Sequence, residues 1–120
     1  MADAGSERRA PGFGVTSHST ASGTMVTVHG ELDAHTAPQV REVVEAAITP
    51  GAQVVVDLTD VTFLDSTGLG VFVTALKHVR EVDGTLDLVI TSPRVLKVFE
   101  LTGLDVVIPI HEEISGALGE

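Results

Sequence analysis

The chain contains no cysteine, tryptophan or tyrosine, and its only phenyl rings are those of four phenylalanines among 120 positions. Without cysteine it has no disulfides, thiol nucleophiles or thiolate metal ligands, which is compatible with a reducing compartment. So few aromatic rings offer little surface on which single-stranded nucleic acid could stack. These absences favour a protein partner over a nucleic acid.

Positive charge is also scarce, because 7 Lys and Arg stand against 17 Asp and Glu and give a net charge of -10. The negative electrostatic potential of such a chain repels nucleic acids and anionic membrane surfaces. No apolar run approaches the length of a membrane span, and residues 1–12 lack the apolar centre of a signal peptide. We therefore expect a cytoplasmic protein with a disordered tail over residues 1–12 and one domain over residues 13–120.

The order of apolar patterns predicts an α/β fold with the sequence ββαβαβαβα. Strands are expected over residues 13–18, 25–29, 54–58, 86–90 and 106–110. Helices are expected over about 36–48, 66–82, 92–102 and 112–118. The first two strands could form a hairpin, and the later strands should be parallel and joined by helical crossovers, so the sheet is mixed but mostly parallel.

Local signals add detail to the helices. Thr36 is expected to cap the first helix with Gln39 as its capping-box partner and Pro38 in the first turn. Two sets of residues are expected to face the core: Leu69, Phe72, Val73, Leu76 and Val79 in the second helix, and Ile114, Ala117 and Leu118 in the last. Pro109 indicates that the last strand lies at an edge of the sheet.

The stretch from Asp65 to Gly70 places a hydroxyl at a helix N-terminus, where unpaired N–H groups and the helix dipole suit either a cap or a phosphoryl group. A cap alone explains most serines at such positions. However, Asp65, Ser66 and Thr67 are three capping residue types in a row, more than one helix end requires. Gly68 and Gly70, each costing about 1 kcal/mol relative to Ala in a helix, would leave the hydroxyl accessible to another protein.

Other chemistries lack their motifs. Val73 stands where a dinucleotide-binding G-x-G-x-x-G would have its third glycine, and Leu64 stands where a G-x-S-x-G nucleophile elbow would have its first. The five histidines are scattered, with no metal-binding spacing. We therefore expect no catalytic residue, no metal and no cofactor of the chain's own.

Several motifs occur in an order typical of one family. Gly30-Glu31-Leu32-Asp33 is followed by Thr36-Ala37-Pro38, by Val56-Asp57-Leu58 and by Phe63-Leu64-Asp65-Ser66-Thr67-Gly68-Leu69-Gly70. From about Phe13 onward the chain resembles the STAS domain of bacterial anti-sigma-factor antagonists. The first motif is weakly specific, whereas the two acid-bearing motifs together, separated by an apolar strand, are strongly so.

The resemblance implies a regulatory function. In that family the serine after the motif aspartate, here Ser66, is phosphorylated by a partner that is both anti-sigma factor and ATP-dependent serine kinase. The unphosphorylated form binds this partner and frees the sigma factor, and a serine phosphatase restores it. The resemblance also implies that Asp33 lies near the phosphoserine. The partner-binding residues are then expected to be Asp33, Asp65, Ser66, Thr67, Gly68 and Leu69.

Two alternatives stay open at this point. The chain could be a non-switching STAS interaction subunit of a transporter or of a stress-signalling scaffold. An enzyme acting through Ser66 is the weaker alternative, since no base or oxyanion motif accompanies the serine. We expect a monomer or weak dimer.

Overall fold

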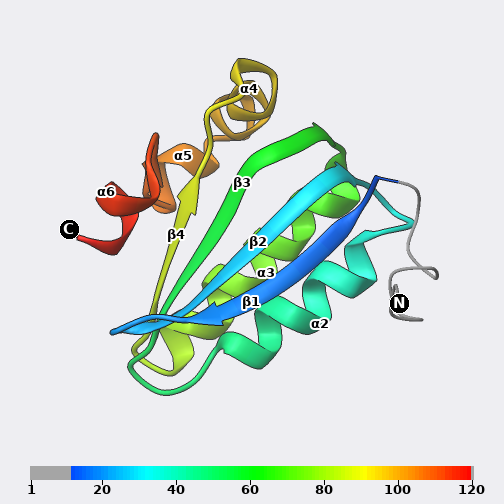
Figure 1. Ribbon diagram of the computed structural model, residues 1–120. Helices are drawn as coiled ribbons and strands as arrows, with labels where there is room; N and C mark the ends of the chain where they lie inside the picture. Colours follow the sequence, from blue (N-terminus) through cyan, green and yellow to red (C-terminus); the bar gives the residue numbers. More distant parts are fainter. Residues whose placement is uncertain (1–11, 120) are drawn as a thin grey trace.

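The computed structural model describes residues 12–119, which form one five-stranded sheet and its covering helices (Figure 1). The strands are β1 (Gly14–Ser19), β2 (Gly23–Leu32), β3 (Gln53–Leu64), β4 (Thr85–Val89) and β5 (Ile110–His111), and they lie side by side in that order. The helices are α2 (Ala37–Ala47), α3 (Ser66–Glu81), α4 (Pro93–Thr102), α5 (Leu104–Val107) and α6 (Ile114–Leu118). The expected tail over 1–12 lies, except for Gly12, outside the described residues.

The expected mixed sheet is confirmed. β1 and β2 form an antiparallel hairpin, and β2–β3, β3–β4 and β4–β5 pair in parallel. Thr20 closes the hairpin turn, because its hydroxyl accepts a hydrogen bond from the backbone N–H of Gly23 at 3.0 Å. The pairing of β2 with β3 slips between Thr27 and His29 and again between Gly30 and Glu31, as at a β-bulge.

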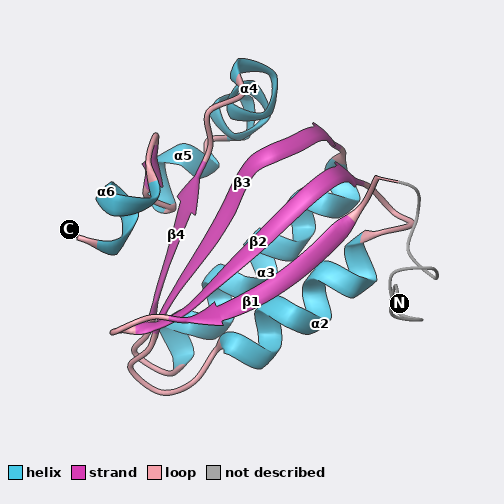
Figure 2. Cartoon of the chain, viewed as in Figure 1, coloured by secondary structure: helices cyan, strands magenta, loops and turns pink. Residues whose placement is uncertain are grey.

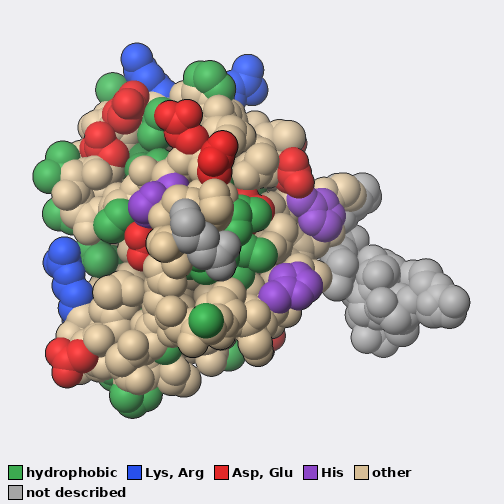
Figure 3. Space-filling view, turned by 60° about the vertical axis from the view of Figure 1, so that its left-hand side comes forward, with side chains coloured by type: hydrophobic (Ala, Val, Ile, Leu, Met, Phe, Trp, Pro, Cys, Tyr) green, Lys and Arg blue, Asp and Glu red, His purple; other side chains and the backbone are tan. Residues whose placement is uncertain are grey.

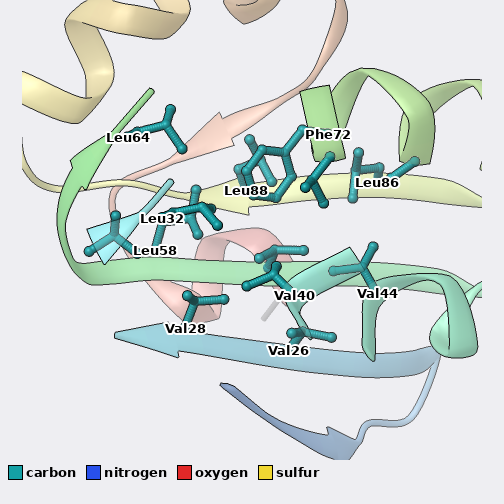
Figure 4. Packing of buried hydrophobic residues seen from close by; sticks show 14 of the residues in the cluster. Val26, Val28, Leu32, Val40, Val44, Leu58, Leu64, Phe72, Leu86 and Leu88 are labelled. Atoms are coloured by element: carbon teal, nitrogen blue, oxygen red, sulfur yellow. The ribbon is translucent and has the colours of Figure 1, made fainter. Parts of the chain in front are cut away.

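The core lies between the sheet and the two long helices. Figure 2 shows α2 and α3 together along one face of the sheet, with α4 and α5 beyond β4. Val54, Val56 and Leu58 of β3 point into this layer, where they join Val40 and Val44 of α2 and Phe72 of α3 (Figure 4). Val55 points to the other face, where α6 covers it through Ala117 and Leu118. β3 is therefore buried on both faces, as its β-branched run predicts.

The ends of α3 and α4 follow from the local sequence. Asp65 caps α3, while Ser92 caps α4 by accepting from the Val95 N–H at 3.3 Å, with Pro93 in the first turn. Gly103 ends α4 in the left-handed region at φ 77, which glycine adopts without a steric penalty. No helix in residues 12–119 is long and apolar enough to span a bilayer.

The expected strand over 106–110 is wrong in its first half. After Gly103 the chain makes the short helix α5, with Asp105 in its first turn, and pairs with β4 only at Ile110 and His111. Val106 is 83% exposed, so its β-branched side chain has no sheet surface to pack on. The edge position that Pro109 indicated is confirmed, since β5 is the last strand of the sheet.

Three further side-chain expectations are wrong. The Thr36 hydroxyl does not cap α2, because it turns back toward the preceding loop. Val73 is 48% exposed on α3, where Val71 and Ala75 are buried instead. Ile114 is 36% exposed, since α6 has five residues and buries only Ala117 fully.

Candidate functional site

Ser66 is the first residue of α3 and is exposed, as is Thr67. The cap of this helix is Asp65, whose carboxylate accepts a hydrogen bond from the backbone N–H of Gly68 at 2.9 Å. A helix needs one such side chain at its N-cap, so Asp65 leaves the Ser66 hydroxyl available for another role. The alternative in which the Ser66 hydroxyl caps α3 is therefore wrong.

The two glycines of the first turn differ in function. A Cβ on Gly68 would lie 2.6 Å from the backbone oxygen of Leu32 and 2.8 Å from its Cγ, so this glycine lets α3 approach β2 closely. Gly70 has open space around it, because a Cβ placed there would have no atom within 4 Å. Gly68 is therefore buried and serves internal packing, whereas Gly70 leaves room for a side chain. Leu69 is half-buried against the core.

The sheet brings Asp33 beside Asp65. Leu32 and Leu64 pair across the parallel strands β2 and β3, and the backbone N–H of Asp65 donates to the Leu32 carbonyl at 3.2 Å. Asp33 directly follows Leu32, and Asp65 directly follows Leu64. Because neighbouring strands lie about 4.8 Å apart, the backbones of the two aspartates lie side by side. Asp33, Asp65 and Ser66 thus follow the carboxyl ends of two neighbouring inner strands, β2 and β3.

Hydrogen bonds hold the Asp33 loop in one conformation. The Asp33 carboxylate accepts from the backbone N–H groups of His35 at 2.9 Å and Thr36 at 3.1 Å. The Thr36 hydroxyl donates to the carbonyl of Glu31 at 2.8 Å and accepts from the Asp33 N–H at 3.0 Å. The backbone hydrogen bond from Thr36, with smaller contributions from His35 and the Thr36 hydroxyl, lowers the pKa of Asp33 against the opposing effect of desolvation. The loop therefore presents a negative charge at neutral pH.

A hollow of about 630 Å³ lies next to this loop. Besides Asp33, its walls include the carboxylates of Glu31 and Asp60 and the imidazoles of His29 and His35. The sequence motifs did not single out Asp60, which comes from the middle of β3. Its position would follow from the parallel register that places it opposite His29.

Acidic side chains outnumber cationic ones on the face seen in Figure 3, where most of them lie in the upper half and the cationic ones lie at the upper and left margins. The described residues form no group of three His, Asp or Glu that could hold a metal ion.

The family model of the STAS domain matches residues 15–117. This range contains all five strands, apart from the first residue of β1, and all of the helices, apart from the last residue of α6. The chain belongs to the STAS domain family. This match confirms the family that the two acid-bearing motifs indicated.

Several curated relatives of this STAS domain are named anti-sigma-B factor antagonist. The anti-sigma-B factor antagonist of Listeria monocytogenes is 45% identical over 86 residues, which are 71% of this chain and 75% of the relative. The protein of the same name from Bacillus subtilis is 39% identical over 93 residues, covering 78% of this chain and 85% of the relative.

Solved structures support the same relationship. The crystal structure of an anti-sigma factor antagonist from Mycobacterium paratuberculosis has a TM-score of 0.82 to this STAS domain at 28% identity, covering 92% of this chain and 95% of that one. The Bacillus cell fate determinant SpoIIAA in its phosphorylated form has a TM-score of 0.65 at 27% identity, covering 87% and 95% of the two chains. The STAS fold of this chain is therefore shared with proteins named as anti-sigma factor antagonists.

Proposed function

We propose that this STAS domain is an anti-sigma-factor antagonist switched by phosphorylation of Ser66. The observation that carries the proposal is the division of work at the start of α3: Asp65 caps the helix, and the exposed Ser66 hydroxyl beside it has no structural task. The names of the relatives support the same conclusion. That SpoIIAA has been solved in a phosphorylated form supports the switch.

The partner is an anti-sigma factor that is also a serine kinase, and it brings ATP and magnesium. Phosphoryl transfer forms the bond between Ser66 Oγ and the γ-phosphorus of ATP as the bond from that phosphorus to the bridging oxygen breaks. ADP leaves, and the hydroxyl proton passes to a base on the kinase. A serine phosphatase reverses the modification. Because sigma factors and ATP are cytoplasmic, the proposal places the protein in the cytoplasm.

The chain's own residues act by position and charge. A phosphoserine adds about -1.5 to -2 charges, and at the N-terminus of α3 the helix dipole and free N–H groups stabilise it without a change of fold. The carboxylates of Asp33 and Asp65 already stand at the carboxyl ends of β2 and β3. Added charge and bulk there repel a docked partner, and about 3 kcal/mol of lost binding lowers affinity roughly a hundredfold. The unphosphorylated protein binds the anti-sigma factor and frees the sigma factor, and the phosphorylated protein does not bind.

Intact-mass spectrometry tests the modified residue. The wild-type chain is incubated with an anti-sigma kinase from its own genome, ATP and magnesium, alongside Ser66→Ala and Thr67→Ala. We expect one phosphoryl group on the wild type and on Thr67→Ala, and none on Ser66→Ala. Single phosphorylation of Ser66→Ala would assign the switch to another hydroxyl. A wild type that binds the kinase without being modified would favour a non-switching interaction subunit.

A further inference from the structure

Strand β1 forms an open edge of the sheet. It is the outermost strand (Figure 1), and within residues 12–119 no strand pairs with its outer side. The strand at the other edge, β5, has only two residues and follows Pro109, so it offers little backbone to a further strand. β1 has six residues, of which the last four are exposed. An edge of this length is a surface on which a strand of another molecule can pair.

The backbone of β1 directs the polar groups of alternate residues outward. In an antiparallel pair, residues that exchange hydrogen bonds with the neighbouring strand alternate with residues whose N–H and C=O groups point away from it. The Thr20 N–H donates to the Gly23 carbonyl at 2.9 Å, which makes these two residues a hydrogen-bonded pair. Because the register along β1 continues from this pair without a break, the N–H and C=O groups of Val15, Ser17 and Ser19 point outward.

These outward groups are arranged symmetrically about Ser17. A second copy of β1 that runs antiparallel, with a two-fold axis at Ser17, places the two Ser17 residues opposite each other and Val15 opposite the partner's Ser19. Each of these pairs can exchange two hydrogen bonds, which gives about six in all. The same axis places Thr16 beside the partner's His18, so the titratable side chains of the two strands do not face each other. β1 is therefore complementary to itself.

The hairpin that carries this edge has no ionic charge to keep a second copy away. The sequence from Gly14 to Gly30 contains no Lys, Arg, Asp or Glu, although the chain as a whole has a net charge of -10. Charged side chains are one of the devices that protect edge strands from pairing with other molecules. Their absence from β1 leaves the edge open to a second chain of the same charge.

The helix side of the edge also leaves room for a second copy. A hollow of about 280 Å³ lies beside Ser17, where α2 lines it with Val43, Ala46 and Ala47. Among the described residues, Glu42 is the one charged residue that lines the hollow, and because it is exposed, water and salt screen its repulsion of the partner's Glu42. Arg41 and Glu45, one turn apart, lie on the side of α2 toward α3, since Glu45 Oε1 is 2.7 Å from His78 Nδ1.

We propose that two copies of this chain pair through their β1 strands, antiparallel about a two-fold axis at Ser17, and so form one continuous sheet. The occupant is a second copy because the outward groups match themselves in register and the edge is uncharged. One pair of short strands buries less surface than the roughly 1,200–2,000 Å² of a stable complex, so the dimer is weak. The pairing is independent of the proposed function, since α2 contacts β1 whereas α3, which begins at Ser66, contacts β3 and β4.

Sedimentation equilibrium of charge-matched variants measures the pairing. The wild type, Ser17→Lys and Ser115→Lys are compared over about a hundredfold range of concentration. Ser17→Lys places two like charges opposite each other at the axis, whereas Ser115→Lys adds the same charge at an exposed position of α6, beside β4 and β5. We expect a concentration-dependent dimer from the wild type and Ser115→Lys, and a dissociation constant at least tenfold higher for Ser17→Lys. Circular dichroism confirms that each variant is folded.

Single cysteines test the register, since the chain has no cysteine of its own. Ser17→Cys places two thiols opposite each other at the axis, with about 5.5 Å between the Cα atoms, a separation that a disulfide spans. Ser19→Cys has its thiol on the same exposed edge, but opposite the partner's Val15. With oxidised glutathione we expect a cross-linked dimer of Ser17→Cys on a non-reducing gel, and little or none of Ser19→Cys.

Several results would overturn the pairing of β1 with itself. One is a wild type that stays monomeric over the whole concentration range. Another is a dimer that Ser17→Lys leaves unchanged, which would place the contact elsewhere, and a third is equal cross-linking of both cysteine variants, which indicates random collision. A monomeric wild type whose complex with the anti-sigma factor is weakened by Ser17→Lys would assign the edge to that partner instead. None of these results bears on the phosphorylation of Ser66.

Discussion

The carboxylate of Asp65 accepts a hydrogen bond from the backbone N–H of Gly68 at 2.9 Å, so the cap of α3 does not depend on the Ser66 hydroxyl. Because Asp65 is the cap, the adjacent Ser66 can gain or lose a phosphoryl group while α3 stays formed. In the proposed switch, the same acid would also add negative charge next to the Ser66 hydroxyl.

The division of work between Asp65 and Ser66 predicts unequal effects on stability. Asp65→Ala removes the cap and should lower the free energy of unfolding by about 1 kcal/mol. Ser66→Ala removes an exposed hydroxyl and should cost well under that amount. Thermal or urea unfolding of both variants measures the difference, and Asp65→Asn, which keeps a capping oxygen, is the control. A larger loss for Ser66→Ala than for Asp65→Ala would return the capping task to the serine.

The glycines of the first turn predict opposite signs for the same substitution. In Gly68→Ala the new methyl meets the Leu32 backbone oxygen at 2.6 Å, which cannot move aside cheaply, so we expect a loss of about 1–3 kcal/mol. In Gly70→Ala the methyl enters open space, and the gain in helix propensity should stabilise the protein by up to about 1 kcal/mol. Urea unfolding compares them directly, and similar changes in both variants would contradict the close approach of α3 to β2.

The sequence predicted much of this arrangement because its signals are local. Asp65 and Ser92 indicate helix starts, Gly103 a helix end, and the β-branched run before Asp57 a strand buried on both faces. That Asp33 and Ser66 belong to one site is implied by the family resemblance and stays a prediction, although the paired ends of β2 and β3 bring the backbone of their two loops close together.

The sequence-based predictions are wrong where tertiary contacts, rather than local sequence, determine the structure. A threonine two residues before a proline looks like a cap, but the loop carbonyl of Glu31 binds the Thr36 hydroxyl instead. The valines of α5 have strand propensity, yet only two residues beyond them find a partner strand. Val73 fits a helical apolar period, but a small change in the rotation of α3 brings Val71 and Ala75 to the sheet.

The lowered pKa of Asp33 predicts a pH dependence of stability. A carboxyl whose pKa is lower in the folded than in the unfolded state stabilises the fold above its unfolded value, near 3.8 here, and that stabilisation is lost as the pH falls through the folded value. We expect Asp33→Asn, which keeps an oxygen acceptor but has no charge, to lose less stability than the wild type over this acidic window. Urea unfolding at about pH 6 and at successively lower pH values makes the comparison. Identical pH profiles would show that Asp33 has the same pKa in both states.

A negative charge introduced at position 66 should act as a phosphate mimic. Ser66→Asp places one negative charge next to Asp65 and the Asp33 loop, at the carboxyl ends of β2 and β3. This charge is smaller than that of a phosphate, and the carboxylate has fewer acceptor oxygens. The variant should fold normally, because an acid at the first position of α3 interacts favourably with the helix dipole. In the complex, the same charge would lie where the kinase otherwise places the terminal phosphate of ATP, so like charges repel.

We therefore expect Ser66→Asp to bind the anti-sigma factor at least tenfold more weakly than the wild type, a difference of about 1.4 kcal/mol. Ser66→Ala should bind as the wild type does, and ATP should not release it, because it has no hydroxyl to modify. Calorimetric titration of the three proteins into one anti-sigma kinase, with and without ATP and magnesium, measures both effects. Equal affinities for all three would place Ser66 outside the interface and make a non-switching interaction subunit the better description of this protein.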